Sequence, residues 1–379
     1  MTSRRDWWHG RREELLDLAG EKTPLCLYNE ETLNETLFDL LSIEAVDRLF
    51  YPMYINSHPK VYEKVYEMDV GFTCLSMDEM ARVFKVFPRM KPQRLLFMPD
   101  SDISEEYEYA LQVGIHVVVR NLFSLRACQD VFQNGEIFIG LEMTYDQGGL
   151  VQGIHFSEME ALSGLLRTRG TTVSGLYLNS KRGFRSSFDL NGTASVFKGV
   201  SAHLPEVSTL ILGNGMCICL EPNRGVLDIP EMGNRLEAIK EISPQYKLWL
   251  DPGPYIISYA GVILTRVIDS FAREHHRYVR INLDMQSYAQ YALDQTQLAM
   301  VNLSKLENEV SSFPHMIVQE IENDSRLCHI KGFAPADEGD ILLIPNVGAI
   351  GLEAGLKSHH DDSDNGYYLK ARKMCPVKI

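Results

Sequence analysis

The sequence predicts an α/β fold, namely a (β/α)₈ TIM barrel with a C-terminal all-β domain. Eight short β-rich runs alternate with stretches of helical spacing over the first two thirds of the chain. These runs are apolar on consecutive residues, which is typical of strands buried on both faces of a parallel sheet. After about residue 258, strand-like runs follow one another with few helices between them, which indicates a separate β-domain.

The predicted barrel spans residues 30–258, and its strands recur along the whole of that range. The eight expected strands are 46–55, 69–76, 94–100, 114–121, 136–143, 172–180, 209–216 and 247–253. Between them, helical spacing predicts helices that include 78–87, 104–112 and 157–168. Several of these helices begin at a Ser or an Asp, whose side-chain oxygen can cap the first turn.

The β-domain is predicted over residues 259–379. Its expected strands are 261–268, 277–284, 316–321, 340–345 and 366–371. The run 23–29 precedes the barrel and is predicted to be a strand that joins this β-domain. Residues 1–29 therefore form an N-terminal segment that belongs with the second domain.

Composition and charge restrict the class of partner. The chain has 379 residues, 45% of them hydrophobic, and can bury a full core. A net charge of −14 disfavours nucleic acids and anionic membranes, because both polyanions would be repelled. There is no apolar run long enough for a membrane span, and residues 1–12 are charged and carry Trp7 and Trp8, so we expect a cytoplasmic protein.

Cysteine and histidine usage gives little support for a metal site. The seven cysteines are scattered, which favours a reducing compartment over a disulfide framework. Cys217 and Cys219 form a C-x-C without a second pair, and apolar packing is the favoured interpretation. The polar run 359–366 is interpreted as an exposed loop, and the eleven histidines show no pair at metal-ligand spacing. No metal is expected.

Several segments resemble one family of enzymes from Trp7 to about Gly351. The matching landmarks are 46–59, 71–83, 248–266, 302–305 and 340–351. They resemble diaminopimelate decarboxylases, which are pyridoxal-phosphate-dependent enzymes of fold type III, related to alanine racemase. The resemblance is strongest to the decarboxylase half of bifunctional aspartokinase/diaminopimelate decarboxylases. It implies a barrel, a β-domain, pyridoxal phosphate in homologues, and a site built across a homodimer.

The cofactor positions that the resemblance implies have changed in this chain. Tyr54 stands where the family has its Schiff-base lysine, and a phenol cannot form an imine. Tyr177 and Asn179 stand at the positions of two histidines, one of which stacks on the cofactor ring in the family. The phosphate loop reads Gly213-Asn214-Gly215 and keeps part of the backbone freedom that lets amides approach an anion.

The remaining family motifs are altered as well. Asp251-Pro252-Gly253-Pro254 replaces a Glu-Pro-Gly-Arg motif, so that an always-charged donor is lost. Ile321 replaces a cysteine implicated in proton transfer, whereas Glu322 matches. Gln290 and Ile350 replace an arginine and a tyrosine. An anion bound without such groups would be desolvated without compensation, so no cofactor is expected here.

Three hypotheses about function follow from these changes. The favoured one is a non-catalytic scaffold or regulatory pseudoenzyme, which forms a homodimer or pairs with a catalytic relative or another biosynthetic protein. The alternative is a repurposed enzyme that works without pyridoxal phosphate, or a binder of amino acids or carboxylates. Its pocket at the barrel mouth would contain Tyr51, Tyr54, Asn56, Tyr177, Asn179, Asp251 and Glu322.

The third hypothesis is a surviving decarboxylase whose lysine comes from elsewhere, for example Lys181 or a partner subunit. Lys181, Arg182 and Arg185 follow the sixth strand and are able to receive an anionic ligand. A solvated loop is the favoured interpretation of these three residues. This hypothesis also requires new contacts to the ring, the phosphate and the carboxylate at once, which makes it the weakest of the three.

Overall fold

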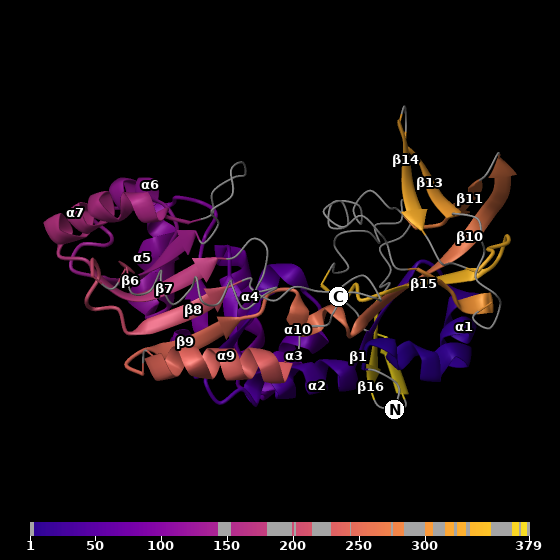
Figure 1. Ribbon diagram of the computed structural model, residues 1–379, viewed down its shortest axis with the longest axis horizontal. Coiled ribbons are helices and arrows are strands. Elements are labelled where there is room, and N and C mark those ends of the chain that lie inside the picture. The colour runs from indigo at the N-terminus through magenta and orange to yellow at the C-terminus, as the bar shows by residue number, and fades with distance from the viewer. Residues whose placement is uncertain are drawn as a thin grey trace.

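The computed structural model has two lobes, a barrel and a β-domain, with the short helix α10 (Tyr255–Ser258) between them (Figure 1). Eight parallel strands close the barrel, and an antiparallel-rich sheet forms the second lobe, so the predicted fold class is confirmed. The residues that the structure describes are 4–142, 153–179, 199–200, 202–213, 229–242, 244–273, 276–283, 300–305, 315–321, 324–330, 334–349, 366–370 and 373–376.

The barrel strands follow one another in chain order, and β9 closes the ring by pairing with β2. They are β2 (Arg48–Pro52), β3 (Gly71–Cys74), β4 (Leu95–Phe97), β5 (His116–Val119), β6 (Glu136–Glu142), β7 (Thr172–Asn179), β8 (Thr209–Gly213) and β9 (Lys247–Asp251). Each expected range contains its strand but runs past one or both of its ends. Tyr54 and Ile55, expected in the first strand, lie in the 3₁₀ turn η2 (Met53–Ile55), because the chain turns inside an apolar run.

One helix, α2 (Glu30–Leu41), precedes the first barrel strand, and the other barrel helices lie between successive barrel strands. The others are α3 (Pro59–Glu67), α4 (Met77–Val86), α5 (Ser104–Val113), α6 (Leu122–Ala127), α7 (Met159–Arg169) and α9 (Ile229–Ile242). Ser76 caps α4 by accepting a hydrogen bond from the Glu79 amide. A cap by Ser104 is not made, since Ser104 is the first residue of α5. Ser157 lies in the 3₁₀ turn η4 (Phe156–Glu158), where His155 forms the capping box instead.

The barrel interior is filled by large side chains that lie over glycines of the next strand. Phe50 of β2 is the register partner of Gly71, and Phe138 of β6 is the partner of Gly175. A Cβ atom at either glycine would come within 2.7 Å or 2.6 Å of the neighbouring ring, so only glycine leaves room for it. The interior cluster contains Phe50, Leu96, Met98, Val118, Phe138, Tyr177, Ile211 and Trp249.

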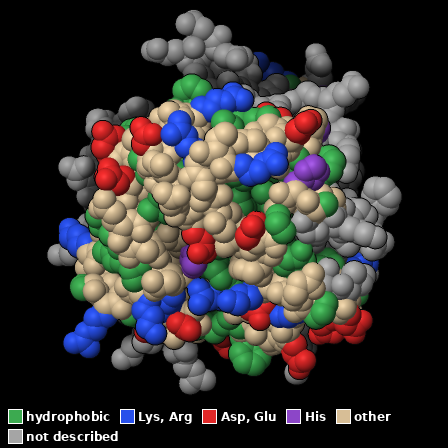
Figure 2. Space-filling model, turned by 90° about the vertical axis from the view of Figure 1, so that its left-hand side faces the viewer, with side chains coloured by type: hydrophobic (Ala, Val, Ile, Leu, Met, Phe, Trp, Pro, Cys, Tyr) green, Lys and Arg blue, Asp and Glu red, His purple; other side chains and the backbone are tan. Residues whose placement is uncertain are grey.

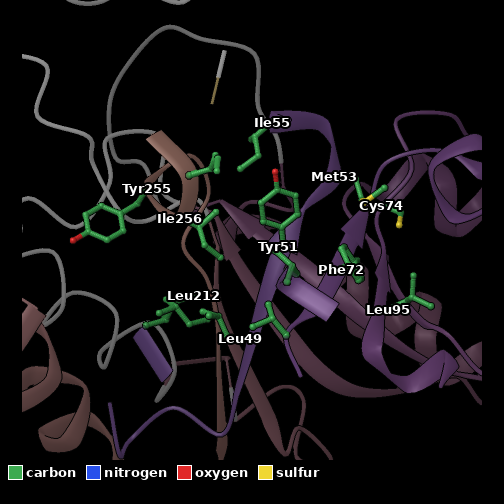
Figure 3. Close-up of a cluster of buried hydrophobic side chains, with 14 of the residues drawn as sticks. Leu49, Tyr51, Met53, Ile55, Phe72, Cys74, Leu95, Leu212, Tyr255 and Ile256 are labelled. Atoms are coloured by element: carbon green, nitrogen blue, oxygen red, sulfur yellow. The ribbon is translucent and has the colours of Figure 1, made fainter. Parts of the chain in front are cut away.

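A second apolar layer lies between the barrel strands and the helices. Alternate residues of each strand point into it, because successive strand side chains point to opposite faces. Tyr51 belongs to this layer and is fully buried. Figure 3 shows it among apolar neighbours that include Leu49 and Phe72.

The β-domain sheet begins with a strand from the amino-terminal segment. β1 (Leu25–Asn29) pairs antiparallel with β10 (Gly261–Arg273) and parallel with β16 (Gly366–Lys370). The other strands are β11 (His276–Ile281), β12 (Val301–Asn302), β13 (His315–Ile321), β14 (Asp324–Ile330), β15 (Ile341–Pro345) and β17 (Lys373–Pro376). Among them β12, β14 and β17 correspond to no expected strand.

The amino-terminal helices pack on this sheet. Two of their side chains donate to β-domain or junction carbonyls: Trp7 Nε1 to Tyr259 O at 3.2 Å, and Arg12 Nε to Leu303 O at 2.8 Å. Trp7 lies in η1 (Arg4–Arg11), and Arg12 is the first residue of α1 (Arg12–Glu21). The acceptor Leu303 lies in η5 (Leu303–Lys305). The remaining 3₁₀ turn, η3 (Pro92–Arg94), leads into β4.

The two lobes meet through a close backbone approach at Gly348. A Cβ atom there would lie 2.1 Å from Ile257 O, so glycine is required. The Gly348 amide donates to Ser258 O at 3.1 Å, and its carbonyl accepts from Asn56 Nδ2 at 2.6 Å. The junction therefore ties the loop after β2 to the β-domain.

Two further observations concern the charges on the molecular surface and the length of the helices. Lys and Arg side chains are interspersed with Asp and Glu on the barrel end that Figure 2 shows. None of the helices in the described ranges is long and apolar enough to cross a membrane.

Candidate functional site

The candidate site lies at the carboxyl end of the barrel. In a parallel barrel all carboxyl ends meet at one face, and ligand sites are built there. Thr73 of β3, Tyr177 of β7 and Asp251 of β9 are brought together at this face by hydrogen bonds. Of these, Tyr177 and Asp251 were predicted from the sequence, and Thr73 was missed.

Asp251 is a buried carboxylate that is held by three donors. Its Oδ2 accepts from Thr73 Oγ1 at 2.8 Å and from the Tyr177 hydroxyl at 3.1 Å. Its Oδ1 accepts from the Gly253 amide at 3.1 Å. The residue is 1% exposed. Both carboxylate oxygens are thus engaged by the protein's own groups.

Burial decides the protonation of this group. Desolvation raises the pKa of Asp251 to about 6, although its three hydrogen bonds act in the opposite direction. Burial, followed by the nearby Asp251 charge, raises the pKa of Tyr177 well above its usual value. The Tyr177 hydroxyl therefore stays protonated and donates its hydrogen bond. The Asp251 carboxyl group is mostly ionised only above about pH 6.

The Tyr177 ring occupies the space next to Gly213, the last residue of β8. A Cβ atom built on Gly213 would lie 2.1 Å from Tyr177 Cζ and 2.3 Å from its hydroxyl oxygen. Gly213 is predicted as a phosphate-loop glycine, and in this structure its open side is filled by a side chain of the neighbouring strand. This contact repeats the pattern of rings over glycines in the barrel interior.

Tyr54 lies at the same end but is 42% exposed. Its interaction with Tyr177 raises the pKa of Tyr177, which places the two phenols near each other. The structure therefore brings four predicted residues together, namely Tyr54, Tyr177, Gly213 and Asp251.

Arg120 is a further side chain at this end that sequence reasoning missed. It directly follows β5, and its Nη2 donates to Pro99 O at 2.9 Å and pairs with Asp100. Its stem lies against Gly140, where a Cβ atom would be 2.8 Å from Arg120 Cγ. The Arg120 charge lowers the pKa of Tyr177, against the larger effect of burial. The signal in the sequence was a charged residue directly after an apolar strand.

Two predicted pocket residues lie elsewhere. Tyr51 points into the layer between strands and helices, and its hydroxyl donates to Asn56 O at 2.9 Å. Asn56 is 2% exposed and uses its side chain on Gly348 O and on the His58 amide. These residues form part of the junction between the lobes, and the structure does not bring them to Asp251.

Other predicted positions fall outside the described residues or side chains. For Asn179 and Ile321 the structure describes the strand but not the side chain. Beyond the described ranges lie Asn214, Gly215, Cys217, Cys219, Glu322, Lys181, Arg182, Arg185, Gln290, Ile350 and residues 359–365 of the polar run, whereas its last residue, Gly366, begins β16. Within the described part of the chain, no three His, Cys, Asp or Glu residues are grouped as metal ligands.

Comparisons with known proteins agree with this architecture. Residues 39–158 match the family described as pyridoxal-dependent decarboxylase, pyridoxal binding domain. The chain is 22% identical over 259 residues to the diaminopimelate decarboxylase of Deinococcus radiodurans. That match covers 65% of this chain and 64% of the relative, which is less than two thirds of the relative's length.

Two solved structures share the fold. The arginine decarboxylase of Paramecium bursaria Chlorella virus, bound to agmatine, has a TM-score of 0.78 at 14% identity, over 94% of this chain and 100% of that one. The diaminopimelate decarboxylase of Helicobacter pylori, complexed with L-lysine, has a TM-score of 0.78 at 17% identity, over 96% of this chain and 95% of that one. At these identities the likeness shows the barrel and β-domain and says nothing of the ligand.

Proposed function

We propose that this chain, a diaminopimelate decarboxylase-like protein with the fold-type III architecture, keeps the decarboxylase scaffold without its pyridoxal phosphate chemistry. It acts as a non-catalytic pseudoenzyme with a regulatory or partner-binding role. The observation that carries the proposal is the Tyr177 ring, which lies over Gly213 and is fixed there by its hydrogen bond to Asp251. A side chain packed against the first glycine of the phosphate loop that the resemblance implies supports a scaffold that works without the cofactor.

The residues present do not fit pyridoxal phosphate. The resemblance places the phosphate at the loop Gly213-Asn214-Gly215, and the Tyr177 ring lies against the first residue of that loop. It places the imine nitrogen at Tyr54, whose phenol cannot form that bond. It places an arginine at Pro254, which has no side-chain donor. Each contact fails for a separate physical reason.

No replacement lysine follows a barrel strand in the described loops. Those loops are 53–58, 75–76, 98–103, 120–121 and 252–254. Lys181 lies in the segment after β7, outside the described residues. A surviving decarboxylase therefore needs a lysine from outside these loops, for example Lys181 or a lysine of a partner subunit.

Incubation with excess pyridoxal phosphate, borohydride reduction and peptide mapping tests this proposal. We expect no stoichiometric lysine adduct and no absorbance band of a protein-bound imine, because neither the nucleophile nor the phosphate site is in place. We expect the Tyr54→Lys variant to behave in the same way, since Tyr177 still fills the space beside Gly213. One equivalent of adduct on a single lysine, such as Lys181, would overturn the proposal.

We also propose that the scaffold works as an assembly, either as a homodimer or with a catalytic relative. Three successive strand-to-helix connections at the carboxyl end of the barrel carry exposed apolar side chains. These are Ile103 before α5 at 47%, Phe123 in the first turn of α6 at 65% and Phe156 in η4 at 50%. Apolar side chains grouped on neighbouring loops are typical of a protein contact. They support an interface at this rim.

Light scattering of the purified chain measures that assembly. We expect a dimer that Phe123→Glu shifts toward monomer, because a charge would be buried at the contact. Phe38→Glu is the matched control, since Phe38 is 67% exposed but lies on α2. A monomeric wild type that co-purifies with no decarboxylase would contradict both forms of the assembly.

A further inference from the structure

We infer that Arg120 forms a binding site for a small monoanionic carboxylate at the barrel mouth. This inference rests on the proposed function, because it requires a mouth that is not occupied by a cofactor. Arg120 follows β5, whereas Asp251 ends β9, which lies across the closed barrel from β5. The two charged groups thus belong to opposite sides of one opening.

The guanidinium of Arg120 is held in place with donors to spare. Both of its contacts, to Pro99 O and to Asp100, use Nη2. Among the described residues, Nε and Nη1 have no hydrogen-bond partner. Pro99 O is a backbone acceptor that fixes the orientation of the group. Nη2 belongs to both bidentate edges of a guanidinium, Nε–H/Nη2–H and Nη1–H/Nη2–H. A planar carboxylate that displaces Asp100 from Nη2 can therefore bind in a bidentate manner, with the free N–H beside it as the second donor.

Space for this side chain comes from Gly140 on the next strand. A Cβ atom at position 140 would lie 2.8 Å from Arg120 Cγ, so a larger residue would push the stem aside. The Arg120 side chain is 14% exposed, compared with 69% for its partner Asp100. An ion pair with so exposed a carboxylate contributes little to the stability of the fold, because water and salt screen the two charges. A ligand that excludes water can compete with Asp100 for the guanidinium.

The surrounding charges select a monoanion. Arg120 supplies one positive charge, and Asp100 and Asp251 supply negative charges at the same end of the barrel. The chain as a whole has a net charge of −14. A phosphate dianion would meet more repulsion than attraction here, whereas a carboxylate is neutralised by the single guanidinium.

Saturation-transfer NMR with benzoate, a planar monocarboxylate, tests the site on the full-length chain. We expect Arg120→Met to weaken benzoate binding about tenfold or more, as the loss of a bidentate charged contact implies. Asp100→Asn should tighten binding a few-fold, because it removes the competing carboxylate. A purely structural role for Arg120 predicts no tightening in Asp100→Asn.

The β-domain offers a matched control pair. Arg277 Nη2 pairs with Asp337 Oδ1 at 2.5 Å, and Asp337 is likewise well exposed, at 63%. Arg277→Met and Asp337→Asn should leave benzoate binding unchanged. Equal losses in Arg120→Met and Arg277→Met, or tighter binding of inorganic phosphate than of benzoate, would overturn the inference. A lysine adduct with pyridoxal phosphate would instead overturn the proposed function, so the two failures are distinguishable.

Discussion

The free energy of unfolding of the Asp251→Asn variant, measured relative to the wild type, should be higher at alkaline pH than at acidic pH. The folded-state pKa of Asp251 is about 6, above its usual value of 3.8, because the carboxyl group is buried. The folded state then holds this proton more tightly than the unfolded state. The stability that Asp251 contributes is fully present below pH 3.8 and is lost as the pH rises through about 6.

The size of the effect follows from the pKa shift. A shift of one unit corresponds to about 1.4 kcal/mol, so the free energy of unfolding of Asp251→Asn minus that of the wild type should rise by roughly 2 to 3 kcal/mol between pH 4 and pH 8. The amide keeps most of the hydrogen bonds, since the Thr73 and Tyr177 hydroxyls can rotate to accept from it. Urea unfolding of both proteins at the two pH values measures this difference.

Subtracting the free energy of unfolding of the wild type at each pH cancels the contributions of the other titrating groups. Desolvation lowers the pKa of His58 and of His116 to about 4, so each contributes stability that is lost as the pH falls from 6.5 to 4. These contributions are common to both proteins and cancel in the difference. Asp130→Asn is the control for the same substitution at the surface, because Asp130 is 86% exposed in its pair with Arg169. A flat difference for Asp251→Asn would mean that Asp251 is not held in a desolvated site.

The general architecture could be predicted because it depends on apolar periodicity. Eight runs that are apolar on both faces indicate a parallel barrel, and the change of pattern after residue 258 marks the β-domain. Strand ends were less well predicted, since residues 53–55 continue the apolar run but turn out of the strand. The short strand β12 and the strands β14 and β17 have too weak a pattern to stand out in the sequence.

The candidate site could be predicted only in part, because the side that a residue faces depends on register. Tyr51 and Tyr177 both occur in apolar strands near their carboxyl ends, yet one points outward to the helices and the other into the barrel. Thr73 lies within the matching landmark 71–83 and Arg120 lies in no landmark, and both were missed because neither stands at a cofactor or substrate position of the resembled family. Their roles appear only when the closed barrel brings Thr73 of β3 to Asp251 of β9, two strands away, and brings Arg120 against Gly140 of the next strand.

A double-mutant cycle at positions 177 and 213 measures whether the Tyr177 ring fills the space beside Gly213. Gly213→Ala places a methyl group where the Tyr177 ring lies, and overpacking of this kind costs about 1 to 3 kcal/mol. In a Tyr177→Ala background the same change should cost almost nothing, because the ring is gone.

Gly164→Ala serves as the control, since Gly164 lies in α7 with open space around it and should gain up to about 1 kcal/mol from helix propensity. Urea unfolding of the five proteins, wild type included, gives the coupling free energy. We expect a coupling free energy of about 1 to 3 kcal/mol between positions 177 and 213. An equal cost of Gly213→Ala with and without Tyr177 would show that the ring lies elsewhere and that the place beside Gly213 is open.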